Sequence, residues 1–181
     1  TTNNNAPDPT PTPTPDDTAP GEASTFLSNE VSAAFGRDVA VRVITGRLTD
    51  ADATNGKVTL TNDTVWALEG PVFVGGDNTD STVLEIEEGT IIFGRTGNDY
   101  LVVSRGSQIE AEGTADAPIT FTSKQDILGE TEGSGQWGGM VLLGQATTNK
   151  CSDPTDCSIQ VEGVTSGGVY GGNDDADNSG T

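Results

Sequence analysis

The chain has 181 residues, which is enough for one domain with a sizeable core and additional tails. Its 8 Lys and Arg residues against 28 Asp and Glu residues give a formal charge of −20, which repels phosphate backbones and anionic lipids. This charge argues against nucleic-acid and membrane-surface binding, and the absence of histidine excludes Ser-His-Asp triads, Cys-His dyads and His-rich zinc sites.

Residues 1–22 are predicted to form a Pro/Thr-rich extended linker or strap. Residues 1–21 hold six of the nine prolines, and such a stretch favours polyproline II over a packed core. It is interpreted either as a tether from a surface or as a strap or O-glycosylated stalk. Because no initiator Met or leader precedes it, the chain is interpreted as processed or as a fragment. Residues 1–5 would also fit the stretch after the lipid-bearing cysteine of a bacterial lipoprotein.

Residues 23–38 are predicted to contain one short amphipathic helix. Apolar residues recur there at helical spacing, at Phe26, Leu27, Val31, Ala34 and Phe35. Gly36 offers a stop, and caps are available at Ser24, Thr25 or Ser28. Placed before a solenoid, such a helix is expected to cover the exposed edge and the apolar end of the first rung.

Residues 39–169 are predicted to form a β-solenoid with inserted loops. After a short alternating strand at 39–44, three segments of strand, tight turn and strand can be aligned on glycines that lie 19 and 17 residues apart, namely Gly70, Gly89 and Gly106. Further strands are expected at 119–122 and 137–143. Units this short leave no room for a helical crossover, so each strand must pair with the rung above it by direct winding.

This alignment predicts two interior ladders of apolar side chains. The first ladder consists of Trp66, Leu68, Leu84, Ile86, Leu101 and Val103. The second consists of Val72, Val74, Ile91, Phe93, Ile109 and Ala111. An up-and-down antiparallel sandwich is the alternative, but the repeated glycine position and the low aromatic content favour the parallel solenoid.

Cys151 and Cys157 enclose a short polar loop, which predicts a local disulfide formed in an oxidising compartment. Zinc is the alternative, but two thiolates without a nearby histidine leave its tetrahedron incomplete. No apolar run approaches the roughly 20 residues of a membrane-spanning helix, the longest candidate being residues 140–143. No transmembrane segment is therefore expected.

Three successive motifs carry a family resemblance. They are LEIEEGTIIFG at 84–94, GSQIEAEGTADAPITFTS at 106–123 and QWGGMVLLG at 136–144. The stretch from about residue 82 to 181 resembles bacterial surface lipoproteins with a right-handed parallel β-helix of the pectin-lyase-like kind. The resemblance implies an all-β solenoid at the outer-membrane surface or outside the cell, similar to the N-terminal portion of a longer solenoid. It implies architecture and location more than activity.

Residues 170–181 are predicted to form an acidic Gly/Asp/Asn loop, which contains the strongest local motif. Residues 175–180 match the first half of a calcium loop, in which alternate oxygens converge on the ion and the glycine permits a sharp turn. The oxygen donors predicted for calcium are Asn173, Asp174, Asp175, Asp177 and Ser179. A weaker version contains Asp50 and Asp52, but its glycine comes one position late. A solvated acidic loop is the alternative interpretation of both.

Four glutamates recur on the predicted rungs and would line one face near Arg105, namely Glu85, Glu87, Glu110 and Glu112. Polysaccharide lyases and hydrolases use such carboxylates in acid–base chemistry, and Trp137 and Tyr170 would stack on sugar rings. The simpler interpretation is that outward charges provide solubility and discourage edge pairing, and that Trp137 is a buried rung residue.

The expected function is that of a non-catalytic structural or interaction protein of the bacterial cell surface. We expect it to self-assemble end to end into a filament or layer, because a helix covers one end of the stack and no closing segment covers the other. The expected partners are further copies or another surface protein. The alternative is a carbohydrate-active lyase or hydrolase, or a polysaccharide-binding protein, and a third possibility is a calcium-stabilised spacer. No catalytic residue is assigned.

Overall fold

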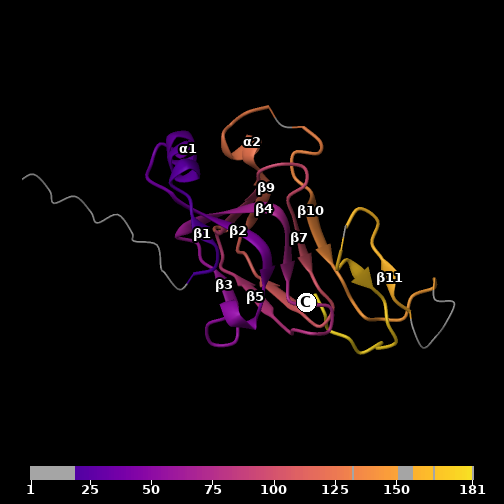
Figure 1. Cartoon of the computed structure of the whole chain (residues 1–181). Coiled ribbons are helices and arrows are strands. Elements are labelled where there is room, and N and C mark those ends of the chain that lie inside the picture. The colour runs from indigo at the N-terminus through magenta and orange to yellow at the C-terminus, as the bar shows by residue number, and fades with distance from the viewer. Residues whose placement is uncertain (1–18, 132, 151–156, 165, 181) are drawn as a thin grey trace, which may run out of the picture.

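The computed structural model describes residues 19–131, 133–150, 157–164 and 166–180 (Figure 1). It confirms the predicted class, because the chain winds as a parallel β-solenoid of about three turns with one short N-terminal helix. In this part of the chain, no helix is long and apolar enough to cross a membrane.

The parallel strands form three faces of the solenoid, which we call sheets A, B and C; A and B are continuous through the long strands β2 and β4. Sheet A contains the first part of β2 (Ala40–Leu48) and of β4 (Thr64–Val74), followed by β6 (Ile91–Gly94) and β9 (Thr120–Ser123). Sheet B contains the second part of β2 and β4, followed by β7 (Tyr100–Val103) and β10 (Gly139–Leu142). Sheet C contains β3 (Val58–Leu60), β5 (Val83–Ile86) and β8 (Gln108–Ala111).

The turn of the solenoid is longer than the repeat predicted from the glycines. Val65 pairs with Ile91 and Ile91 with Thr120, so successive turns take 26 and 29 residues. The three aligned glycines lie at three different corners of the stack: Gly70 between sheets A and B, Gly89 between C and A, and Gly106 between B and C. All three have positive φ, of 69°, 80° and 82°, which glycine adopts without strain. A shared corner conformation therefore produced the apparent repeat.

The interior is a continuous apolar core between the three sheets. Its buried members are Ile44, Leu48, Val58, Leu60, Trp66, Leu68, Val72, Val74, Leu84, Ile86, Ile92, Leu101 and Val103. The predicted first ladder and the Val72 and Val74 part of the second ladder are thus confirmed. Ile109 and Ala111 align with Leu84 and Ile86, but they belong to the last described strand of sheet C, so Ile109 is half-buried and Ala111 is exposed.

The prediction that Ile91 and Phe93 face the interior is wrong. β6 pairs Ile92 with the inward Trp66, so the flanking Ile91 and Phe93 point outward. Alignment on the glycines displaced this strand by an odd number of residues, and such a displacement moves every side chain to the other face.

The predicted helix is present as α1 (Thr25–Phe35), with Ser24 as N-cap and Gly36 as C-cap at φ 65°. Its buried Leu27 and Val31 pack on the outer face of sheet A, which also contributes outward Phe93. The expectation that α1 covers the apolar end of the first rung is corrected, because α1 covers an outer face and the edge of β2. Ala19 is the residue that contacts the interior core there.

The segment before α1 is held against the first strand. β1 (Glu22–Ala23) pairs antiparallel with β2. The buried guanidinium of Arg42 donates hydrogen bonds to the carbonyls of Ala19, Pro20 and Gly21 at 2.7, 3.0 and 2.6 Å. Residues 1–18 of the predicted linker lie outside the described residues.

The outer faces of the three sheets differ in what covers them. α1 and α2 (Lys124–Ile127) cover sheet A through Leu27, Val31 and Ile127. The segment with β11 (Ile159–Gln160) and β12 (Val169–Tyr170) covers sheet B, with Val164 and Tyr170 packing near Phe73 and Val102. Apart from the half-buried Val83, the outward residues of sheet C are polar, and in the described part of the chain no helix or hairpin packs on them. Sheet C is therefore the open face of the solenoid.

Candidate functional site

The open face of sheet C carries stacked carboxylates. Thr59, Glu85 and Glu110 lie in one row across β3, β5 and β8. Glu87 and Glu112 follow two residues later on the same side, because side chains alternate along a strand. A shallow groove of about 440 Å³ is lined by Ile86 and by the five carboxylates that we call the acidic face, namely Glu85, Glu87, Glu88, Glu110 and Glu112. The prediction that the glutamates share one face is confirmed.

One lysine lies on the acidic face, and sequence analysis did not assign it a role. Lys57 Nζ lies 2.9 Å from Glu85 Oε1 and also forms an ion pair with Glu110. Hydrogen bonds to Glu110 and Glu85 raise the pKa of the Lys57 amine above its usual value. The hydrogen bond from Lys57 lowers the pKa of the Glu85 carboxyl, with a smaller contribution from the Thr59 hydroxyl at 3.2 Å. Lys57 is therefore a protonated bridge between two rungs at neutral pH.

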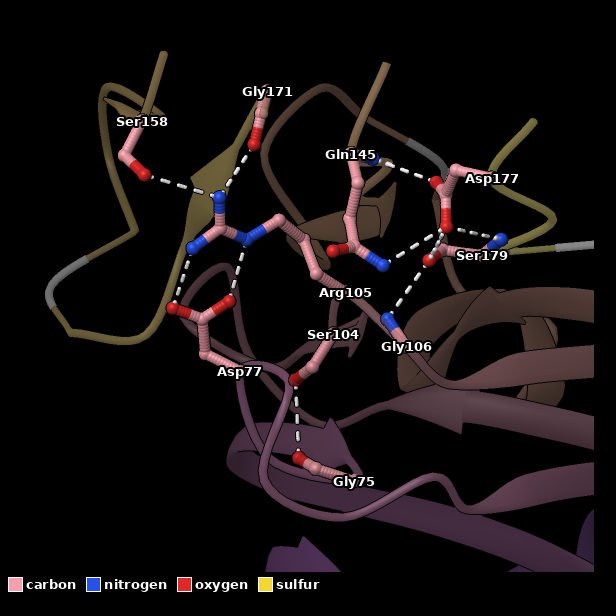
Figure 2. Close-up of polar contacts among 10 residues, drawn as sticks. All are labelled: Gly75, Asp77, Ser104, Arg105, Gly106, Gln145, Ser158, Gly171, Asp177 and Ser179. Carbon is pink, nitrogen blue, oxygen red and sulfur yellow. Dashed lines mark hydrogen bonds and ion pairs between the residues drawn. The ribbon is translucent and has the colours of Figure 1, made fainter. Parts of the chain in front are cut away.

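Arg105 does not join the acidic face, contrary to the prediction. Arg105 is 8% exposed, and its guanidinium forms a bidentate pair with Asp77, with Nε to Oδ1 at 2.5 Å and Nη2 to Oδ2 at 2.7 Å (Figure 2). Its Nη1 also donates to the Gly171 carbonyl and to Ser158 Oγ. Two parallel charge-assisted hydrogen bonds fix the orientation of the guanidinium relative to the carboxylate. Arg105 therefore joins the corner between sheets B and C to the segment that covers sheet B.

Asp177, predicted as a calcium ligand, holds the acidic loop to this corner. Its Oδ2 accepts from Gln145 N at 2.6 Å, and its Oδ1 accepts from Gln145 Nε2 and from the amide and hydroxyl of Ser179 (Figure 2). Ser179 Oγ in turn accepts from Gly106 N at 2.8 Å. Burial raises the pKa of Asp177, but the hydrogen bonds from Ser179 and Gln145 outweigh it, so the net pKa is lowered.

Asn173, Asp174 and Asp175, which are also predicted calcium donors, have surroundings different from those of Asp177. Asp175 Oδ1 accepts from Thr147 N at 3.1 Å, Asp174 Oδ1 accepts from Ala176 N at 3.0 Å, and Asn173 is exposed. Among the described residues, no group of three or more acidic or cysteine side chains is placed to hold a metal ion. Asp175 and Asp177 accept hydrogen bonds from protein groups in this structure. Calcium binding stays a prediction.

The weaker calcium motif has a local structural role. Asp52 Oδ2 accepts from the Thr49 amide at 2.8 Å and from its hydroxyl at 3.0 Å, which forms a capping box at the short helix η1 (Asp50–Asp52). Asp50 is exposed.

The predicted disulfide and aromatic residues lie away from the acidic face. Cys157 is 3% exposed and is not a free thiol, but Cys151 lies outside the described residues, so the Cys151–Cys157 bond stays a prediction. Trp137 stacks on Phe121 with ring centroids 6.4 Å apart and is half-buried. Tyr170 packs in the cluster on sheet B. The aromatic and acidic residues expected to bind sugars together are thus on separate surfaces.

Three parallel sheets wound around one apolar core are the architecture of a β-helix, and a family comparison identifies its kind. The family model described as "Pectate-lyase like beta helix domain" matches residues 51–181. The chain belongs to this family. The matched pectate-lyase-like β-helix includes sheet C, the acidic face and the Arg105 corner, whereas α1 and β2 precede it. No curated protein and no solved structure shows a significant match.

Proposed function

We propose that this pectate-lyase-like β-helix is a non-catalytic structural and interaction module of the bacterial cell surface, and that its contact surface is the acidic face. The observation that carries the proposal is the difference between the three outer faces. Elements of the chain itself cover the apolar outer faces of sheets A and B, whereas the outer face of sheet C is polar and open. A large exposed surface of one charge is suited to binding an oppositely charged partner.

The charges on this face indicate a binding surface more than a catalytic one. General acid–base catalysis works best with a group whose pKa lies near the working pH. The pKa shifts on this face lead away from neutrality, because the pKa of Lys57 is raised and that of Glu85 is lowered. The buried Arg105 is engaged in its pair with Asp77. These features support a module that binds without chemistry.

The partner that fits is a cationic segment of another surface protein. Five carboxylates and one lysine leave the face strongly negative. The flat β-surface offers them in rows, with Glu85 and Glu110 in register on adjacent strands. Contact between a basic segment and these rows would be governed by electrostatic attraction, which salt weakens.

Stacking into a filament fits the structure less well than contact through the acidic face. Head-to-tail growth needs a free strand edge at both ends of the stack. The edge of β2 is already paired with β1 at Arg42 and Val43, and serine hydroxyls of α1 contact Val41 and the preceding Val39. We therefore place the proposed contact on sheet C.

The test measures the binding of an arginine-rich peptide to the full chain by fluorescence anisotropy at several salt concentrations. The face variant Glu87→Gln/Glu112→Gln removes two charges without touching the Lys57 bridge. We expect it to bind about fivefold or more weakly, since each lost charge contact contributes about 0.5–1 kcal/mol. The control Glu22→Gln/Glu162→Gln removes the same charge from two exposed sites elsewhere and is expected to bind nearly as the parent does.

Equal weakening of peptide binding in the two variants would show that net charge alone attracts the peptide, and would contradict the proposal.

The alternative of a carbohydrate-active or polysaccharide-binding protein is favoured by the open acidic groove in a pectate-lyase-like fold. Incubation with acidic and neutral polysaccharides distinguishes it, because unsaturated or new reducing ends that disappear in Glu85→Gln would establish catalysis on this face.

A further inference from the structure

A tight turn leads into β3, the first strand of sheet C. Asn55 and Gly56 form its tip, with φ of 54° and 83°, and both residues are exposed. Thr54 N donates to the Lys57 carbonyl at 2.8 Å, and Lys57 N donates to the Thr54 carbonyl at 3.2 Å. Positive φ at both central residues is typical of the two-residue turn that Asn-Gly favours. The turn therefore fixes the position of Lys57, which directly precedes β3.

The two residues at the tip of the turn are not held by hydrogen bonds. In the described part of the chain, neither the side-chain amide of Asn55 nor the backbone N–H of Gly56 has a hydrogen-bond partner. No atom beyond its chain neighbours lies within 4 Å of the place that a Cβ atom on Gly56 would take. The amide carbon of Asn55 and the backbone nitrogen of Gly56 are thus free to approach each other.

We propose that Asn55 is a site of spontaneous deamidation, at which the chain releases the turn that positions Lys57. The Gly56 nitrogen loses its proton to solvent and attacks Asn55 Cγ. The new C–N bond closes a cyclic imide, and Asn55 Nδ2 leaves as ammonia. Solvent water then opens the imide at either of its carbonyl carbons, which produces an aspartate or an isoaspartate. Glycine favours this closure, because it has no side chain to crowd the ring and its backbone rotates freely.

The isoaspartyl product changes the course of the main chain. The bond to Gly56 then runs through the former Cγ, so the backbone of the turn gains one carbon. A two-residue turn matches the pairing of Thr54 with Lys57 only at its normal length, so these hydrogen bonds are lost. Lys57 bridges Glu85 and Glu110 on the acidic face. Deamidation therefore loosens the chain at this bridge, and it adds a negative charge to a chain whose formal charge is already −20.

Asn62 provides a comparison within the same molecule. It is also exposed, but its Nδ2 donates to the Glu88 carbonyl at 3.0 Å, and the residue that follows it, Asp63, has a side chain. The leaving group is thus held and the attacking nitrogen is crowded. Asn55-Gly56 is the only Asn-Gly pair of the sequence. This inference is independent of the proposed role of the acidic face.

The test follows the full chain during incubation at neutral and at mildly alkaline pH. Deamidation adds about 1 Da, which mass spectrometry of peptides from the chain assigns to a residue. We expect Asn55 to convert severalfold faster than Asn62, and faster at the higher pH because the Gly56 nitrogen must lose its proton. In the isoaspartyl form, separated by ion exchange, we expect hydrogen exchange at the Lys57 amide to be about tenfold faster, as for loss of one hydrogen bond.

Two variants separate the chemistry from the turn itself. Asn55→Gly keeps a sequence that favours the same turn but has no amide to lose, so its mass and its slow exchange at Lys57 should persist. Asn55→Asp has the charge of the product without the additional backbone carbon, and its Lys57 amide should exchange as in the parent. Conversion of Asn62 as fast as that of Asn55, an Asn55 that stays intact, or an isoaspartyl form with unchanged exchange at Lys57 would overturn the proposal.

Discussion

At the residue scale, the carboxylates of this chain are used for structure more than its sequence suggests. Asp177 belongs to a calcium-like motif, yet it accepts hydrogen bonds from Gln145 and Ser179. Asp52 belongs to a second such motif, yet it caps a turn of helix with Thr49. The carboxylate of an Asp residue can accept hydrogen bonds from backbone amides and can also bind cations. A motif of alternating Asp residues therefore does not distinguish a structural role from a calcium site.

Replacement of Asp177 should reveal its role through pH dependence. The pKa of Asp177 is lowered from its usual 3.8, so its stabilising effect is complete above that value and is lost as pH falls through the lower folded-state pKa. At pH 7, we expect Asp177→Ala to lower the free energy of unfolding by about 1 kcal/mol, since solvent partly screens these hydrogen bonds. Urea denaturation of the variant and the parent at several pH values measures this change in the free energy of unfolding.

The difference in free energy of unfolding between Asp177→Ala and the parent should shrink below pH 3.8, as the Asp177 carboxyl of the parent becomes protonated. Asp116→Ala changes an exposed aspartate and should show little effect at either pH. A loss of stability in Asp177→Ala that stays constant down to low pH would contradict a role for the ionised carboxylate.

At the element scale, the helix could be predicted from its sequence but its packing could not. The spacing of Leu27 and Val31 and the stop at Gly36 predict the helix that is observed. Its position depends on the outward residues of sheet A, and the misplaced register of β6 hid one of these, Phe93. A contact between elements far apart in the sequence depends on both registers at once.

Two neighbouring residues of α1 should differ strongly in their effect on stability. Leu27 is 2% exposed against the outer face of sheet A, whereas Phe26 is 66% exposed. We expect Leu27→Ala to lower the free energy of unfolding by about 2–4 kcal/mol, because it leaves a cavity in a packed cluster. Phe26→Ala should cost less than about 1 kcal/mol, including its contact with Lys124. Similar losses in urea denaturation would show that α1 does not pack on sheet A.

At the scale of the whole molecule, a β-helix with a formal charge of −20 gathers five of its 28 acidic residues along one groove. Glu85 and Glu110 are stacked in register, and Lys57 relieves their repulsion. Glu87 and Glu112 have no lysine partner among the ion pairs of the described chain. Repulsion between like charges in adjacent rows destabilises a sheet.

Salt should therefore stabilise this protein. Between about 10 mM and 0.3 M NaCl the screening length falls from roughly 30 Å to below 8 Å, which weakens the repulsion between carboxylates. We expect the Tm to rise by several degrees over this range in thermal unfolding followed by circular dichroism. The rise should be smaller in Glu87→Gln/Glu112→Gln than in Glu22→Gln/Glu162→Gln. A Tm that falls with salt would indicate that ion pairs such as that of Lys57 outweigh the repulsion.

The sequence by itself favoured the correct class of structure, because short apolar strands punctuated by glycine are well suited to stacking as rungs, although an antiparallel sandwich would also bury them. It also determined the helix and the placing of four glutamates on one face, since both depend on spacing within short segments. Only the tertiary structure decided which strands are neighbours. The glycines Gly70, Gly89 and Gly106 adopt similar conformations at different corners, so local geometry does not reveal the length of a turn.

The partners of Lys57, Arg105 and Ser28 were likewise decided by the tertiary structure. Lys57 reaches glutamates 28 and 53 residues away, and Arg105 binds Asp77 across one turn. Ser28 protects an amide on a strand that its own helix precedes. These contacts exist because the winding of the chain brings distant segments into register, and winding is a property of the whole stack.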